Sequence, residues 1–146
     1  MRFLAPPEPS TAFPGGAESI RLGAQVFDRV GCSTCHTPEL RTSPISSIPA
    51  LRDKPVRLYS DLALHDMGKL GDGIAQGLAN GNEFRSAPLW GLGQRVFFLH
   101  DGRTRDLVEA IEQHESSGSD ANQVIGLYNG LSNQEKQNLL NFLRSL

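Results

Sequence analysis

The sequence of 146 residues lacks several features that would place it in a familiar class. No apolar run is long enough to span a bilayer, so no transmembrane segment is predicted. The formal net charge is only −2, which gives no basic field for nucleic acid or for an acidic membrane. The first ten residues lack the apolar stretch of a secretory signal. We therefore expect a mature form or a domain behind a start methionine, with a single core.

Cysteine is also scarce, and both cysteines lie in one short motif. Residues 31–36 read Gly-Cys-Ser-Thr-Cys-His, so no cysteine remains for a structural disulfide or a second zinc-ligand pair. A thioredoxin-like redox pair would need no histidine directly after it. A Cys-x-x-Cys-His run is typical of covalent c-type haem attachment, in which the thiols join two vinyl groups. The motif predicts one haem c bound through Cys32 and Cys35, with His36 as the proximal iron ligand.

The N-terminal part of the chain divides at about residue 16. Proline and glycine concentrate in residues 1–16, which predicts an extended tail or the stub of a linker. From Ala17 onward, apolar residues recur at helical spacing up to the haem motif. Gly23 within this helix would allow a close helix crossing. We therefore expect one cytochrome c-like haem domain over residues 17–146.

The rest of the chain predicts a few more helices separated by loops. Ser132 and Glu135 have the spacing of a capping box, so the closing helix should begin there. Shorter helices are expected near Thr104–Glu115 and Asp120–Tyr128, while residues 37–102 are rich in glycine and proline. No strand alternation persists and no repeat is present. The pattern favours an all-α, cytochrome c-like fold, with about four to five helices around one haem.

Methionine is nearly absent, which narrows the choice of sixth iron ligand. Apart from the first residue, the only methionine is Met67, which lies in the loop-rich middle beside Gly68. A thioether ligand raises the haem potential, a second histidine lowers it, and an open position allows ligand chemistry. We predict Met67 as the ligand, with His65, His100 or an open position as alternatives. His114 is set aside as a surface residue near the end of a polar helix.

Other residues are candidates for the surroundings of the haem. A ligating histidine usually donates its second N–H to a carbonyl, and Pro49 resembles the start of the Pro-x-Leu loop that accepts it in class I cytochromes c. An ordinary turn proline is the equal alternative. Donors available for the haem propionates are Arg52, Arg57, Arg85 and Trp90. Candidate wall residues, each equally suited to a general core, are Phe27, Trp90, Leu92, Phe97 and Phe98.

Three further segments occur in a fixed order after the haem motif. They are YSDLALHDMG at 59–68, EFRSAPLWGL at 83–92 and FLHDGR at 98–103. With the motif, they resemble the C-terminal haem domain of the di-haem thiol-oxidoreductase-like proteins, which is similar to di-haem cytochrome c peroxidases and MauG enzymes. The resemblance covers roughly residues 18–146. It departs from the family in having one haem motif, and in having Leu99 where the peroxidase branch carries its methionine ligand, which returns that role to Met67.

Two function classes follow from this resemblance and from the motif. The first is electron transfer by a single haem with His36 and Met67 as axial ligands, either as a carrier or as the domain through which electrons enter a larger redox enzyme. The second is a haem enzyme of peroxidase type or a small-ligand sensor, which needs a displaceable ligand and an acid–base group such as His65 or Asp66. The first requires no catalytic residues, and we favour it. We also expect a periplasmic location, an unidentified redox partner protein and a possible partner haem domain.

Overall fold

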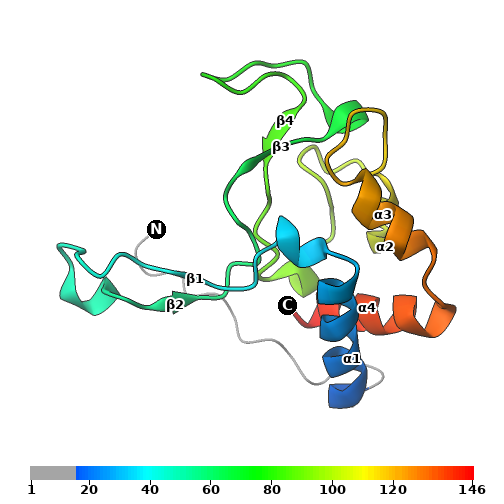
Figure 1. Ribbon diagram of the computed structural model, residues 1–146, viewed down its shortest axis with the longest axis horizontal. Helices are drawn as coiled ribbons and strands as arrows, with labels where there is room; N and C mark the ends of the chain where they lie inside the picture. Colours follow the sequence, from blue (N-terminus) through cyan, green and yellow to red (C-terminus); the bar gives the residue numbers. More distant parts are fainter. Residues whose placement is uncertain (1–15) are drawn as a thin grey trace.

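The computed structural model describes residues 16–146, which form a helical core with two extended segments (Figure 1). The predicted N-terminal tail, apart from Gly16, lies outside the described residues. The α-helices are α1 (Gly16–Arg29), α2 (Leu107–Glu112), α3 (Asn122–Asn129) and α4 (Asn133–Ser145). The single-turn 3-10 helices are η1 (Cys32–Thr34), η2 (Pro49–Leu51), η3 (Gly68–Leu70) and η4 (Leu92–Gln94).

The all-α prediction is wrong, because the described part of the chain also contains two antiparallel two-stranded sheets. These pair β1 (Leu40–Arg41) with β2 (Pro55–Val56), and β3 (Leu64–Asp66) with β4 (Glu83–Arg85). Each strand has only two or three residues, which is too short for a period-two pattern in the sequence. The fold is therefore mixed, with four α-helices in residues 16–146.

Helices α1 and α4 cross closely and hold most of the apolar core. A side chain on Gly23 would clash with the backbone of Asn138 and come within 2.6 Å of Phe142 Cβ, so glycine permits the predicted close crossing. The core is formed by Val26, Phe27, Val30, Leu92, Leu107, Tyr128, Leu139, Leu140, Phe142, Leu143 and Leu146. The two ends of the domain are thus packed against each other, and the haem motif directly follows α1.

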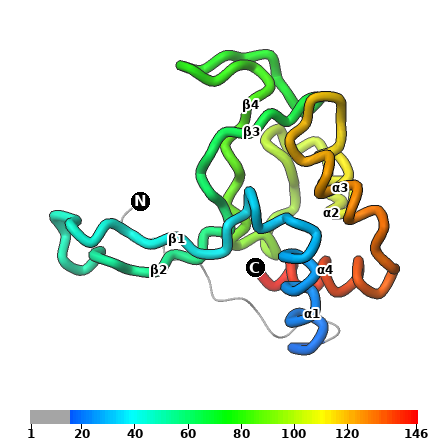
Figure 2. The backbone as a smooth tube through the Cα atoms, viewed as in Figure 1, coloured from blue at the N-terminus to red at the C-terminus, as the bar shows by residue number. Residues whose placement is uncertain are grey.

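Two segments extend from this core in different directions, as the backbone trace shows (Figure 2). The segment that carries β1, η2 and β2 forms an arm on one side, and the loop between β3 and β4 projects on another. Helices α2 and α3 lie beside the β3–β4 segment. None of the helices in residues 16–146 combines the length and apolar character needed to cross a bilayer.

Helix α4 begins with the predicted capping box, which is confirmed. The Ser132 hydroxyl and backbone N–H donate to the Glu135 carboxylate at 2.7 and 2.9 Å, and Arg29 forms an ion pair with it. These interactions lower the pKa of Glu135 from 4.5 to about 2. The pKa of Glu135 is lower in the folded state than in the unfolded state. Its contribution to the stability of the fold is therefore complete above pH 4.5 and is lost as the pH falls through about 2.

We therefore predict that Glu135→Gln removes part of the acid sensitivity of the fold. The free energy of unfolding of the wild type, measured by urea titration, should fall more steeply than that of the variant between pH 4.5 and 2. Glu112→Gln, at an exposed glutamate on α2, is the matched control and should keep the wild-type slope. Parallel curves for all three proteins would contradict the prediction.

Candidate functional site

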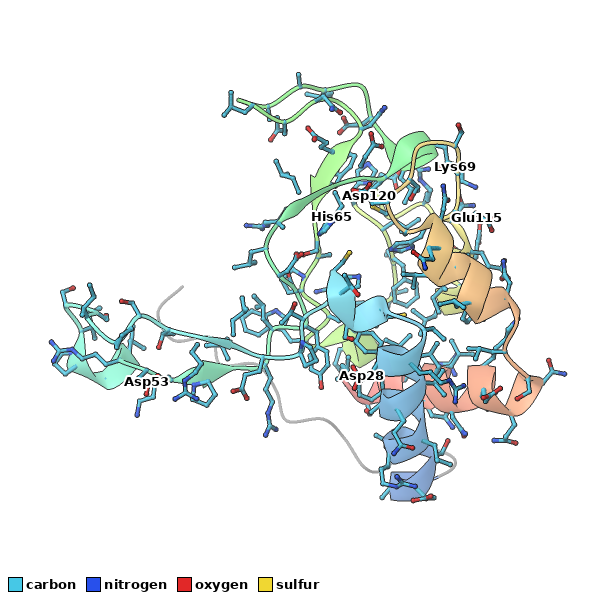
Figure 3. All side chains as sticks on the ribbon, viewed as in Figure 1. Asp28, Asp53, His65, Lys69, Glu115 and Asp120 are labelled. Atoms are coloured by element: carbon cyan, nitrogen blue, oxygen red, sulfur yellow. The ribbon has the colours of Figure 1, made fainter. Side chains whose placement is uncertain are left out.

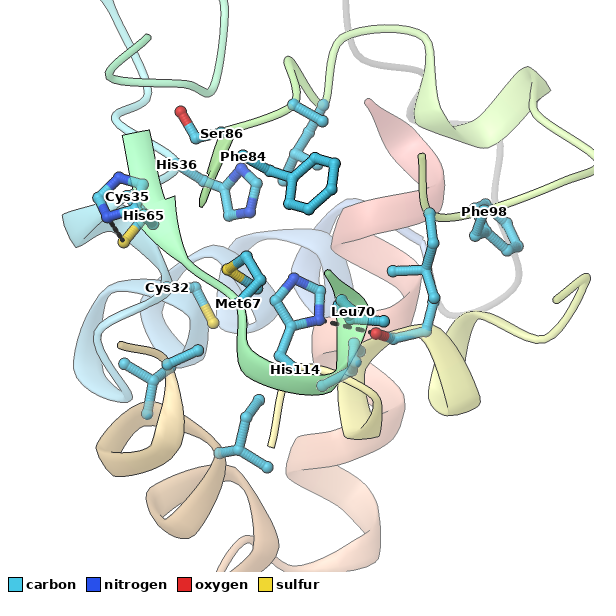
Figure 4. A pocket seen from close by; sticks show the side chains of 18 of the residues that line it. Cys32, Cys35, His36, His65, Met67, Leu70, Phe84, Ser86, Phe98 and His114 are labelled. Atoms are coloured by element: carbon cyan, nitrogen blue, oxygen red, sulfur yellow. Dashed lines mark hydrogen bonds between the residues drawn. The ribbon is translucent and has the colours of Figure 1, made fainter. Parts of the chain in front are cut away.

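A cavity of about 380 Å³ opens between the helical core and the β3–β4 segment (Figure 4). This volume lies within the range of small-molecule pockets, which are roughly 300–1,000 Å³. The lining side chains come from every α-helix and from β3, β4, η1, η3 and η4. Its apolar wall includes Phe27, Leu70, Phe84, Leu89, Leu92, Phe98, Leu107, Ile111, Val124, Ile125, Leu139 and Leu143. The cavity is therefore suited to a large apolar group.

The Cys-x-x-Cys-His motif lies at the edge of this cavity. Helix α1 ends at Arg29, and Gly31 adopts a left-handed conformation at φ 92° that starts η1. Cys32 and Cys35 both line the cavity as free thiols. Burial raises the pKa of Cys32 to about 12 and also raises that of Cys35, so both stay protonated at neutral pH.

His36 also lines the cavity, and its ring is oriented by the backbone. Its Nδ1 lies 3.2 Å from the carbonyl oxygen of Tyr59, so the N–H on Nδ1 donates and Nε2 is left as the metal-binding nitrogen. Burial lowers the pKa of His36 to about 4, which keeps the imidazole neutral. A neutral, oriented imidazole is what an iron ligand requires.

Pro49 was given two equal alternatives, a carbonyl acceptor for His36 or an ordinary turn proline, and the carbonyl beside His36 belongs to Tyr59. Pro49 starts η2 on the arm, is exposed, and does not line the cavity. Tyr59 has φ 54°, which is unusual for an aromatic residue and costs on the order of 1–3 kcal/mol. This strained backbone brings its carbonyl to the histidine.

Two further side chains point into the cavity as candidate opposite ligands. Met67, between β3 and η3, lines the cavity, which is the position that a ligand of a bound haem must have. His114 lines it too, and its Nδ1 lies 2.8 Å from the Ala110 carbonyl on α2. Burial lowers the pKa of His114, against the effect of that hydrogen bond. Figure 4 labels both Met67 and His114 among the side chains that line the cavity.

The prediction that His114 is a surface residue is wrong, because its side chain lines the cavity. Helix α2 ends at Glu112, and the chain then turns so that His114 faces the core. A signal was present, because Leu107, Ala110 and His114 follow the helical spacing of one buried face. The polar residues around His114 hid this spacing.

His65 belongs to a hydrogen-bonded chain at the cysteine side of the cavity. Its Nε2 lies 2.9 Å from an Asp61 carboxylate oxygen, and its Nδ1 lies 3.6 Å from Cys35 Sγ. Burial raises the pKa of Asp61, but hydrogen bonds from Ser86, a backbone N–H and His65 outweigh it and lower the pKa overall. Figure 3 shows His65 near Asp120, whose carboxylate is 3.9 Å from Nδ1. Both ring nitrogens of His65 are therefore engaged.

The other candidates are divided between the cavity and the outer surface. His100 is an exposed lining residue whose ring stacks on Phe84 with centroids 4.3 Å apart. Arg85 is exposed and also lines the cavity, whereas Trp90 does not. Arg52 and Arg57 lie at or near the arm, and Phe97 is 53% exposed outside the cavity. The sequence analysis missed Arg95, a lining residue.

The residues around the cavity fit a c-type haem. Two partly buried thiols spaced three apart lie on one side, beside a neutral histidine whose Nδ1 is held by a carbonyl. A second histidine and a methionine line the same cavity. The mainly apolar wall matches the porphyrin faces, and Arg85 supplies a donor for carboxylates.

Comparison with known proteins agrees with this chemistry. The family model described as "Di-haem oxidoreductase, putative peroxidase" matches residues 9–146. No curated protein matches the chain. A solved hydrazine synthase structure from Kuenenia stuttgartiensis, pressurised with xenon, has a TM-score of 0.63 at 21% identity. The alignment covers 99% of this chain and 52% of that one, so the chain spans about half of its structural neighbour.

Proposed function

Because the chain belongs to the di-haem oxidoreductase family, we propose that it transfers electrons with one covalently held haem as its redox centre. The family supports a haem redox function. A bound haem supplies the one-electron chemistry of its iron. The sequence contains one Cys-x-x-Cys-His motif, which accounts for one attached haem. In this proposal Cys32 and Cys35 form the thioether links and His36 is the proximal ligand.

The observation that carries the proposal is the similar environment of two partly buried histidines that line one cavity. His36 and His114 each direct Nδ1 toward a backbone carbonyl, of Tyr59 and Ala110 respectively, and in this proposal Nε2 of each binds the iron. We infer that His114 is the sixth ligand, in preference to the sequence-based choice of Met67.

Two held axial ligands favour electron transfer over peroxidase chemistry. A peroxidase needs a vacant position with an acid–base group beside it. His65, the candidate for that group, is bound by Asp61 and faces Cys35, so it supports the attachment side of the cavity rather than an open face. The residues of this chain then bind, orient and shield the redox centre from water.

The partner and the location are also proposals. The family is described as di-haem, and this chain covers about half of its structural neighbour, which supports a second haem domain as a redox partner. Covalent attachment supports a periplasmic location. An unidentified redox partner protein would complete the electron path.

The test is the state of the haem in protein produced with a bacterial c-type maturation system. Haem should stay with the chain on a denaturing gel, and Cys32→Ala/Cys35→Ala should lose all of it, because the thioethers are its only covalent links. The native protein should show one reversible one-electron wave and no peroxide-dependent oxidation of a dye. Peroxide turnover by the native protein would contradict the electron-transfer proposal in favour of the peroxidase.

A further inference from the structure

A second cleft, of about 560 Å³, lies beside the haem cavity and shares part of its wall. Arg95 and Phe98 line both spaces, as do Leu92 and Leu107. The remaining lining residues of the cleft are Gly93, Arg105, Asp106 and Arg144. A group bound in this cleft would therefore be separated from the haem cavity by a single layer of side chains.

The cleft is strongly basic in a chain whose net charge is negative. Three arginines and one aspartate line the cleft, whereas the whole chain carries 14 basic and 16 acidic residues. Arg95, Arg105 and Arg144 line the cleft, and no carboxylate in residues 16–146 forms an ion pair with them.

The one acidic residue that lines the cleft offsets at most one of the three arginine charges. The Asp106 carboxylate caps helix α2 and accepts backbone N–H groups of Val108 and Glu109 at 2.7 and 3.4 Å. Arg95 donates to the Pro88 carbonyl at 3.0 Å, which holds its position without cancelling its charge. The cleft thus presents three guanidinium groups, which suit carboxylates.

The chain next to the cleft adds apolar surface. Val96 and Phe97 directly follow Arg95, and their side chains are 60% and 53% exposed. The guanidinium carbon of Arg105 lies 4.5 Å from the centre of the Phe97 ring. Arginine and aromatic side chains are enriched in protein–protein interfaces. A small anion would contact only the arginines, whereas a larger partner would also cover Val96 and Phe97.

We propose that this arginine cleft is the docking site for an acidic surface of a redox partner protein. The inference rests on the proposed electron-transfer function and adds the kind of partner and the face at which it binds. Carboxylates of the partner contact Arg95, Arg105 and Arg144, while its apolar residues cover Val96 and Phe97. The position beside the cavity wall brings the partner close to the redox centre.

The first test measures binding of poly-L-glutamate, as a model acidic surface, to the haem-loaded protein at low ionic strength. The triple variant Arg95→Gln/Arg105→Gln/Arg144→Gln should bind at least ten-fold more weakly than the wild type. The control Arg41→Gln/Arg52→Gln/Lys54→Gln removes equal charge from the arm and should bind like the wild type. Equal weakening of both variants would overturn the proposal, because it would report net charge alone.

The second test measures the rate at which two small oxidants of opposite charge oxidise the reduced protein. Oxidation by ferricyanide should slow about ten-fold in the cleft variant, and poly-L-glutamate should inhibit it in the wild type. Oxidation by tris(phenanthroline)cobalt(III), a cation, should not slow. Slower ferricyanide oxidation without inhibition by poly-L-glutamate would identify a small-anion site and overturn the protein partner.

Measured midpoint potentials separate the remaining explanations. If the cleft variant has a shifted potential and spectrum but unchanged poly-L-glutamate binding, its arginines hold the haem's own carboxylates and the proposal is overturned. If the wild type binds poly-L-glutamate through the cleft but has no reversible redox wave, the proposed electron-transfer function fails. The arginine cleft then still stands as a docking site for an acidic surface. These two failures therefore give different results.

Discussion

Replacing His114 with alanine is expected to convert the oxidised haem from a low-spin to a high-spin spectrum. His114 lines the cavity, and the Ala110 carbonyl holds its Nδ1, so its loss removes the proposed second ligand. Met67→Ala is the matched control and should leave the low-spin spectrum unchanged. Optical and electron paramagnetic resonance spectra of the two variants measure this directly.

Other patterns of spectra would identify a different sixth ligand or an open position. A far-red sulfur-to-iron band in the native protein, lost in Met67→Ala and kept in His114→Ala, would establish Met67 and contradict His114. If neither variant changes the low-spin spectrum, His100 becomes the ligand to test, since it also lines the cavity. A high-spin native protein would exclude two held ligands and would reopen the peroxidase alternative.

The same assignment predicts the direction of a potential change. His114→Met should raise the midpoint potential, because a thioether raises it relative to a second imidazole within the roughly 0.8 V that axial ligands span. Potentiometric titration of the wild type and the variant measures the change. An unchanged or lowered potential would show that residue 114 does not bind the iron.

Gly23→Ala is expected to give the largest loss of stability of any single methyl addition on α1. The new Cβ would meet the Asn138 backbone and lie 2.6 Å from Phe142 Cβ, so α1 and α4 must move apart. Such overpacking costs about 3 kcal/mol, at the upper end of its usual range. Urea unfolding of the haem-loaded protein measures the difference in free energy.

Gly126 provides the matched control on another helix. It lies within α3, and a Cβ there would meet nothing within 4 Å. Gly126→Ala should therefore stabilise the protein by up to about 1 kcal/mol, since alanine has the higher helix propensity. Equal effects at the two positions would show that the α1–α4 crossing is not the site of the strain.

The structure requires glycine at position 68 for a different reason from the one predicted from the sequence. The sequence suggested that glycine beside Met67 lets the backbone approach the porphyrin. In the structure, a side chain there would clash with Ser116 and lie 2.7 Å from the Ser117 carbonyl, at φ 53°. The glycine thus allows the chain after β3 to pack against the loop that follows α2. His114 belongs to the same loop.

Chemistry carried by neighbouring residues was determined by the sequence alone. Cys32, Cys35 and His36 are adjacent along the chain, so their spacing predicts the cofactor without a fold. The capping box at Ser132 and Glu135 is similarly local, because a helix start depends on four consecutive residues. The family was also identified from ordered short segments, and the family match agrees.

Features that join distant segments were decided only by the tertiary structure. The strands are too short to leave a pattern, and they pair only because long loops close around them. The Tyr59 carbonyl reaches His36 through an unfavourable backbone conformation that no residue preference predicts. His114 and Arg95 become part of the cavity only when α2 and η4 pack against α4 and the haem motif. Sequence spacing thus predicted the cofactor, and packing decided which side chains line the cavity.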